Sequence, residues 1–268
     1  MWNGFLPPGI RSWARTLLLL ALTAAPLGTV AGCRPAVIRV PVTPEDIARS
    51  NAIALEGDVA FARRDFYASL IKYLEAGRLN PNNHVVYNKM GIAYSRLGFF
   101  TESFAAFTRS IGLNPKYPYS YNNIGSVYFA TNNKKKAEQY FKKAISLKDD
   151  DASFHINLGT LYFERNQFEK GIQEWRKGLS LDPGILKKSE GGLVAAISQK
   201  NSPEKSYFMA RFYASTGNTE RAVESLQQAL KDGFTDLKAL LTEHDFDPIR
   251  KQEKFIEFMK YAIQLLKS

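Results

Sequence analysis

MGIAYSRLGFFTESFAAFTRSIGLNP, residues 90–115, contains the pattern that decides the fold. Small residues stand at Gly91 and Ser103, a large aromatic ring at Phe107, and a proline at position 115. Small residues let two helix backbones approach, aromatic rings fill the gaps beside them, and proline ends a helix. The stretch therefore predicts two antiparallel helices joined by a short turn.

The same pattern returns every 34 residues, most clearly at Gly57, Gly91, Gly125 and Gly159. A single helix pair cannot bury its apolar face, but stacked pairs can, so a fixed period of this length predicts a solenoid. Other positions repeat at the same interval, and we call each such set of equivalent positions a column of the repeat. The further columns are the small residues Ser69, Ser103, Ala137 and Gly171, and Ala76, Ser110, Ala144 and Gly178; the aromatic residues Tyr73, Phe107, Phe141 and Trp175, and Tyr94, Tyr128 and Tyr162; and the helix-ending Pro81, Pro115, Asp149 and Pro183.

This spacing and chemistry resemble the tetratricopeptide repeat. The resemblance implies an all-α fold, a right-handed superhelical α-solenoid of helix pairs, with four units over residues 44–183. Two positions depart from the family pattern, because Ala60 replaces a tyrosine and Lys134 takes an aromatic position.

Beyond Pro183 the phase breaks. The recognisable small residues at Ala210, Ala222 and Ala229 come half a repeat late, which predicts a half-repeat insertion over 184–202 and a fifth unit over 203–232. Residues 233–268 resemble the tail found after tetratricopeptide arrays in many bacterial proteins and should form capping helices. Their apolar spacing predicts one buried helix face, made of Phe255, Phe258, Ile263 and Leu266.

The N-terminus has the basic, apolar, small-residue order of a secretory signal peptide over residues 1–32. Val30-Ala31-Gly32-Cys33 resembles the lipobox of bacterial lipoproteins, which implies a lipidated Cys33 followed by an extended tether over 33–43. Arg34 in place of aspartate then favours the outer membrane, facing the periplasm. Ordinary cleavage near Ala31, an uncleaved anchor and a chance cysteine are the alternatives.

Composition narrows the classes of function. The formal net charge is +10, and the surplus lies in runs such as Lys134-Lys135-Lys136, Lys142-Lys143 and Lys187-Lys188. Solvation explains such runs, with anionic lipid or an acidic protein as the alternative contact, and no nucleic-acid partner is expected. One cysteine excludes an internal disulfide framework.

The chemistry-bearing residue types form no cluster along the sequence. The three histidines lie far apart, so no metal, cofactor or catalytic constellation is expected. His155 should fill an aromatic packing position, and His244 to Asp247 should begin a helix before Pro248. We expect a non-enzyme, with an unrecognised site in 184–202 as the remaining enzymatic alternative.

Tetratricopeptide solenoids usually bind peptides along a concave face lined by the first helices, and the resemblance implies a protein or peptide partner there. The expected function is a membrane-anchored adaptor; the alternative is a self-associating component of a pilus or secretion assembly, which would be an oligomer. Asn123 and Asn157 lie one residue further round their helices than the groove residues Asn122 and Ile156, and we expect them to be structural. Carried onto this register, the groove residues are Asp58, Phe61, Asn88, Ile92, Ser95, Arg96, Tyr119, Asn122, Ser126, Phe129, Ile156, Thr160 and Phe163.

Overall fold

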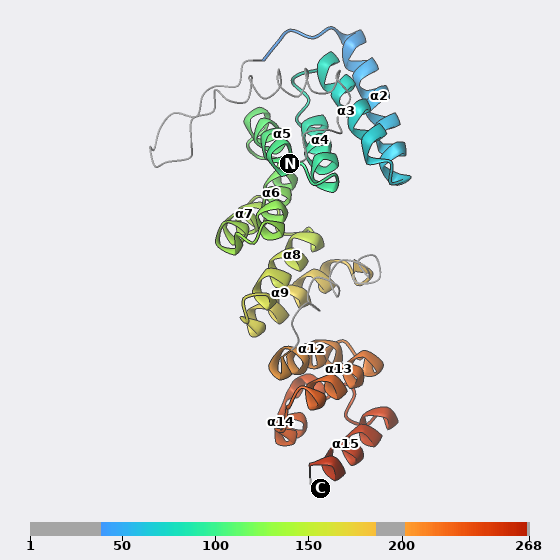
Figure 1. The fold of residues 1–268 in the computed structure, drawn as a ribbon, viewed down its shortest axis with the longest axis vertical. Coiled ribbons are helices and arrows are strands. Elements are labelled where there is room, and N and C mark those ends of the chain that lie inside the picture. The colour runs from blue at the N-terminus through green and yellow to red at the C-terminus, as the bar shows by residue number, and fades with distance from the viewer. Residues whose placement is uncertain (1–38, 186–201, 267–268) are drawn as a thin grey trace, which may run out of the picture. The chain divides into compact units, whose positions relative to one another are not determined.

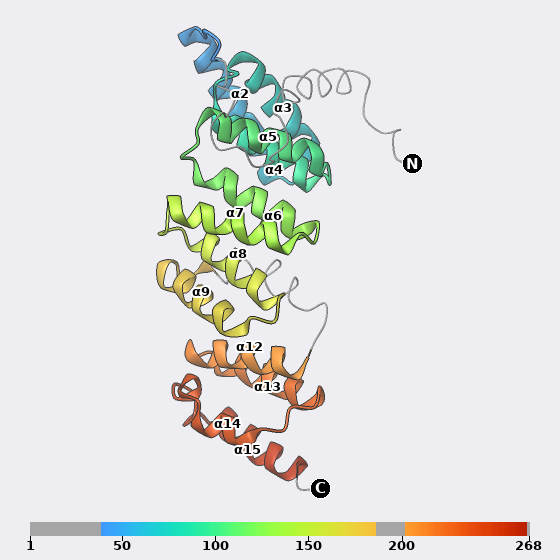
Figure 2. The same cartoon turned by 90° about the vertical axis from the view of Figure 1, so that its left-hand side faces the viewer.

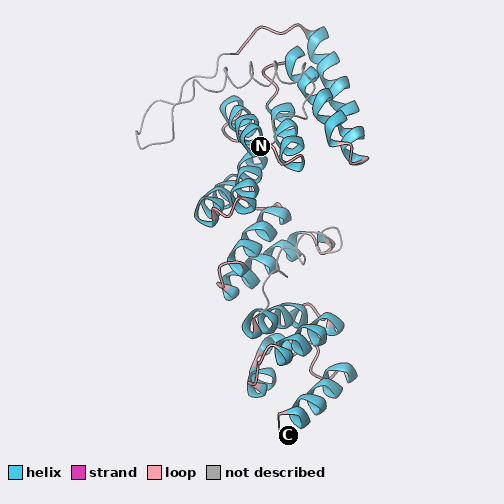
Figure 3. Ribbon diagram, viewed as in Figure 1, coloured by secondary structure: helices cyan, strands magenta, loops and turns pink. Residues whose placement is uncertain are grey.

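The computed structural model describes residues 39–185 and 202–266, which consist of helices and connecting loops (Figure 3). The expected signal peptide, the lipidation site Cys33, the first tether residues and most of the insertion lie outside the described residues. The chain divides into two compact bodies, which we call the N-terminal body, up to Asp149, and the C-terminal body, from Asp150.

The N-terminal body consists of antiparallel helix pairs, which Figures 1 and 2 show from two sides. Its first helix begins at Pro44, after Thr43, whose Oγ1 accepts a hydrogen bond from the backbone N–H of Asp46 at 3.1 Å. This cap satisfies one of the N–H groups that a helix start leaves unpaired. The pairs are α2 (Pro44–Ala62) with α3 (Phe66–Leu79), α4 (His84–Arg96) with α5 (Phe100–Leu113), and α6 (Pro118–Ala130) with α7 (Lys134–Leu147).

Each pair closes over the glycine of the repeat. A Cβ placed on Gly91 would lie 2.5 Å from the ring of Phe107, and one on Gly125 would lie 2.6 Å from Phe141. Both rings are buried. The predicted role of the small residues is confirmed: they let the aromatic ring of the second helix lie directly against the first helix.

The turn inside each pair also repeats, through a left-handed backbone that the sequence pattern alone did not reveal. Gly98 has a φ of 79°, and Arg64, Asn132 and Asn166 have φ values of 62°, 60° and 58°. These positions form one column of the repeat. Glycine and asparagine tolerate this conformation, whereas an arginine there is strained.

The C-terminal body begins with the fourth pair, and its second helix has glycine at both small-residue positions, Gly171 and Gly178. The next pair starts at Pro203, one and a half repeats after Ala152, which agrees with the predicted break in phase. The elements are α8 (Ala152–Phe163) with α9 (Phe168–Leu181), α12 (Pro203–Ser215) with α13 (Thr219–Lys231), α14 (Leu237–Thr242), the 3₁₀ turn η1 (His244–Phe246) and α15 (Glu253–Leu265).

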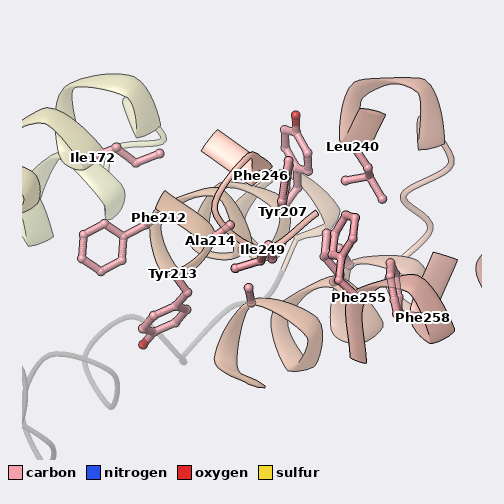
Figure 4. Packing of buried hydrophobic residues seen from close by; sticks show 14 of the residues in the cluster. Ile172, Tyr207, Phe212, Tyr213, Ala214, Leu240, Phe246, Ile249, Phe255 and Phe258 are labelled. Atoms are coloured by element: carbon pink, nitrogen blue, oxygen red, sulfur yellow. The ribbon is translucent and has the colours of Figure 1, made fainter. Parts of the chain in front are cut away.

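The C-terminal cap keeps the repeat period. α14 begins one full repeat after α12, and α15 begins one full repeat after α13, so the cap is a sixth pair whose first helix is shortened to six residues. The 3₁₀ turn follows α14 and places Phe246 in the core, where it packs with Tyr207 and Phe255 (Figure 4).

Two expectations about this cap are corrected. Phe255 and Phe258 are buried as expected, but Ile263 and Leu266 are 40% and 43% exposed. Met259 and Ala262 are buried instead, because the i, i+3, i+4, i+7 series that starts at Phe255 defines the face packed against the body. The expected helix start at His244 to Asp247 is a single 3₁₀ turn, in which Asp245 accepts a hydrogen bond from Arg211 Nε at 3.0 Å.

Candidate functional site

Most of the predicted groove residues lie on α2, α4 and α6, the first helices of the pairs in the N-terminal body. α4 contacts α6, and an ion pair joins α4 to α2. Arg96 is exposed, while Asn88 and Asn122 are buried. The partly exposed groove residues of this body are Asp58, Phe61, Ile92, Ser95, Tyr119, Ser126 and Phe129. These seven partly exposed residues and Arg96 make up what we call the first-helix face.

A charged cluster joins α2 to α4 on this face. Asp58 accepts a hydrogen bond from the hydroxyl of Tyr73 at 2.7 Å and forms an ion pair with Lys89 at 2.6 Å. Burial, together with the hydrogen bond to Asp58, raises the pKa of the Tyr73 hydroxyl, so it stays a donor. Lys89 is not among the predicted groove residues. It occupies the same repeat column as Asn123 and Asn157, which are expected to be structural.

An amide cluster joins α4 to α6. The Oδ1 of Asn88 accepts a hydrogen bond from Asn123 Nδ2 at 3.0 Å and lies 3.0 Å from Ser120 Oγ. Asn88 is 5% exposed. Its carbonyl therefore holds two helices together, and Asn123 has the structural role that its position predicts.

The remaining groove candidates of this body differ in what they contact. The hydroxyl of Tyr119 lies 3.0 Å from Lys148 Nζ, and Ile92 packs beside the cluster around Phe107. Ser126 Oγ donates to the backbone carbonyl of Asn122 at 3.2 Å. What this face offers a partner is apolar area at Phe61 and Phe129, the cation of Arg96, and the Asp58–Lys89 pair.

The three groove candidates of the C-terminal body lie inside the fourth pair. Phe163 is fully buried and stacks on Trp175 with ring centroids 4.0 Å apart. Ile156 and Thr160 are 4% and 6% exposed, and Thr160 Oγ1 donates to the Ile156 carbonyl at 2.8 Å. These residues pack within the protein, so we do not retain them in the binding surface.

The glycines of α9 explain this inward packing. A Cβ on Gly171 would lie 2.2 Å from the ring of Phe163, and a Cβ on Gly178 would lie 2.9 Å from Ile156. The second and third pairs have serine or alanine in those columns. Space left by the two missing methyl groups lets the first-helix side chains turn toward α9.

The histidines pack against other side chains. His155 is buried and its Nδ1 lies 2.7 Å from Glu174 Oε2, so it fills a packing position but adds a polar contact to α9. Burial lowers the pKa of His84, whose ring packs edge-on against Tyr117 at 4.7 Å. Over residues 39–185 and 202–266, no three side chains of His, Cys, Asp or Glu gather as a metal site would require.

Arg39 and Val40, which fall in the expected tether, lie against the N-terminal body. The side-chain amide of Asn82 pairs with Val40, accepting from its N–H at 3.1 Å and donating to its C=O at 2.6 Å. Arg39 lies 3.4 Å from the Leu113 carbonyl and lines a cavity of about 490 Å³ together with His84. The helices of the described residues include none long and apolar enough to cross a membrane.

Two stretches of the chain match models of the tetratricopeptide repeat, residues 118–151 and residues 207–238. The chain contains tetratricopeptide repeats. The first match covers the α6–α7 pair, and the second covers most of α12 and all of α13. No curated protein matches the chain.

Solved structures support the same fold. A thermophilic tetratricopeptide-repeat protein of Thermus thermophilus is 16% identical, with a TM-score of 0.50 over 80% of this chain and 99% of that one. The pilF protein of Pseudomonas aeruginosa is 13% identical, with a TM-score of 0.53 over 83% of this chain and 92% of that one. At these identities the likeness concerns the fold: an all-α solenoid of tetratricopeptide helix pairs.

Proposed function

We propose that this protein is a non-enzymatic, membrane-anchored adaptor of the bacterial cell envelope, which binds a segment of a partner protein along the first-helix face. Tetratricopeptide repeats are in general interaction modules, which supports this class of function over catalysis. The proposal limits the site to α2, α4 and α6, because the corresponding residues of α8 are buried.

One observation carries the proposal. On α6, Phe129 stays partly exposed, whereas the aromatic rings of the second helices, such as Phe107 and Phe141, are buried in the pairs. Covering an exposed ring with a partner stabilises a complex, at about 25 cal/mol per Å² of apolar area removed from water. Arg96 and the Asp58–Lys89 pair add polar groups that fix the orientation of a bound segment.

The test replaces surface side chains and leaves the helix pairs intact. Phe129→Glu combined with Arg96→Glu should abolish capture of the partner in a pull-down from envelope extracts. The matched control combines Lys135→Glu with Gln139→Glu, which changes the charge by the same amount at exposed positions of α7. Capture that survives the first pair of substitutions would rule out the first-helix face.

The membrane anchor is part of the proposal and rests on sequence. The lipobox-like residues before Cys33 support lipidation, and the contacts of Val40 with Asn82 are consistent with a tether that ends against the body. We place the protein at the outer membrane, facing the periplasm. Cys33→Ser should release it from the membrane, and mass spectrometry of the mature N-terminus should find an acylated Cys33; an intact Met1 would contradict the anchor.

A self-associating component of an envelope assembly is the second candidate. It is favoured by exposed apolar side chains on the two helices of the first pair, where Leu55 is 63% exposed and Tyr67 and Ile71 are each 49% exposed. Such a patch marks an interaction site when it is contiguous. Light scattering separates the candidates, because a monomer at about 50 μM favours the adaptor and a concentration-dependent mass favours self-association.

A further inference from the structure

The sixth helix pair leaves a groove that is separate from the first-helix face. One side is a stripe of α13 that includes Glu220, Val223 and Glu224; the other is a stripe of α15 that includes Lys254 and Glu257. Both stripes have i, i+3, i+4, i+7 spacing, so each follows a single face of its helix. Between them lies a cavity of about 390 Å³.

The short first helix of this pair explains the groove. In the N-terminal body each second helix packs on the first helix of the next pair, α3 on α4 and α5 on α6. α14 has only six residues, and here α13 packs against α15 instead. Two second helices therefore border one surface, and their first turns meet where Lys254 Nζ lies 2.9 Å from Glu220 Oε1.

The groove combines an apolar floor with an acidic rim. Val223 is half-buried and Phe258 is buried, while Tyr261 stands at the edge with 55% of its surface exposed. Glu224 and Glu257 are exposed beside them, and the lysine of the lining, Lys254, is already paired with Glu220. The groove is thus negatively charged in a chain whose formal net charge is +10.

We propose that this groove binds a short basic segment of a partner protein. One lysine or arginine of that segment pairs with Glu224 and Glu257, and one apolar side chain lies over Val223 against Phe258 and Tyr261. Charge complementarity selects a cationic occupant. The volume lies in the range of about 300–1,000 Å³ found for small-ligand pockets, so it accepts a few side chains rather than a whole helix. With the first-helix face, the adaptor then has two docking surfaces.

A defined peptide tests the site on the full chain. The probe is the synthetic peptide acetyl-GSKFKSG-amide, and the readout is the NMR signal of the Val223 methyl groups. We expect a saturable shift that weakens as salt rises, because exposed charges are screened. A peptide with glutamate in place of both lysines should give no shift.

Variants separate the groove from its surroundings. Glu224→Lys with Glu257→Lys should weaken peptide binding at least tenfold, and Tyr261→Ala should weaken it severalfold. Glu204→Lys with Glu253→Lys makes the same change of charge at exposed positions outside the lining and should leave binding unchanged. Phe129→Glu with Arg96→Glu should also leave it unchanged, so failure of the first-helix face and failure of this groove are distinguishable.

Three results would overturn the proposal. These are the absence of a Val223 shift with the lysine peptide, equal losses from the groove and control charge reversals, and a Val223 shift that appears with protein concentration alone. The last result would identify a second copy of the chain as the occupant.

Discussion

The two bodies of this protein share one repeat but differ in charge. Residues 39–149 contain 16 lysines and arginines and 9 acidic residues, whereas residues 150–268 contain 17 basic and 17 acidic ones. The formal net charge of +10 therefore comes from the residues before Asp150, and the C-terminal body is neutral overall. A repeat fixes which positions pack inside a pair and leaves the remaining surface to vary, so each body can recognise a different partner.

The bodies also differ at equivalent positions of the first helices. Phe129 and Phe163 occupy the same column of the repeat, yet Phe129 is partly exposed and Phe163 is fully buried. The residue opposite them decides the outcome: Ala137 in α7 fills the space that Gly171 leaves open in α9. A residue's repeat column alone does not settle whether it faces a partner.

The largest expected effect comes from removing this difference. Gly171→Ala should destabilise the C-terminal body by about 3 kcal/mol, because the new methyl group would lie 2.2 Å from the Phe163 ring in a well-packed core. The reciprocal change, Ala137→Gly, should cost the N-terminal body about 2 kcal/mol through a lost buried methyl group and a freer helix backbone. Chemical unfolding measures both, and a neutral Gly171→Ala would contradict the packing explanation.

Arg211→Ala should have the next largest effect, about 2 kcal/mol. The Arg211 side chain is 11% exposed and pairs with Glu169 at 2.6 Å and Asp245 at 3.0 Å, so its loss removes the cation that joins α9 to the 3₁₀ turn and leaves Asp245 with Arg176 alone. Hydrogen exchange should then rise over residues 243–250. Lys142→Ala, which breaks an exposed pair with Glu138 in the N-terminal body, should cost under about 0.5 kcal/mol. Equal effects would show that the Arg211 cluster does not anchor the cap.

Arg64→Gly should stabilise the N-terminal body by about 1 kcal/mol. Arg64 has a φ of 62°, a conformation that strains most residues with a Cβ, arginine among them. Asn132→Gly at the equivalent turn should change stability less, because asparagine tolerates this region. Thermal unfolding of the two variants tests the ranking, and a destabilising Arg64→Gly would contradict it.

The smallest expected effect is a pH dependence confined to the N-terminal body. Burial lowers the pKa of His84, so the unfolded chain takes up the proton more readily than the folded one. The contribution of His84 to stability is complete above its ordinary pKa and falls as the pH drops below about 6.5. His84→Gln should remove this component of the stability-versus-pH curve between pH 7 and pH 5.5; an unchanged curve would exclude His84 as its source.

The repeat could be predicted from sequence because its packing is local. Gly91 and Phe107 meet within one helix pair, so their spacing along the chain already describes their contact. The left-handed turn at Arg64 had no such signal, because arginine does not mark positive φ. For residues 233–268 the sequence predicts capping helices and not a sixth pair, since the shortened first helix lacks the small-residue pattern that identifies a repeat.

The candidate site was less predictable because exposure depends on more than one column. Asp58 was predicted, but its partner Lys89 was not, although the two lie on neighbouring first helices and are joined by an ion pair. Phe163 shares the repeat column of Phe129, but Gly171 on the facing helix leaves room for its ring to pack inside the pair. The acidic groove depends on α15 packing directly against α13, a contact that no periodicity along the chain encodes.

Site-specific photocrosslinking in the native host tests the central claim most directly. A benzoylphenylalanine placed at Phe129 or Phe61 should crosslink one envelope protein, identified by mass spectrometry, while the same probe at the exposed Lys135 of α7 should not. The account predicts that Phe129→Glu with Arg96→Glu abolishes the Phe61 crosslink. Equal crosslinking from Lys135, or none from either phenylalanine position, would contradict a partner bound along the first-helix face.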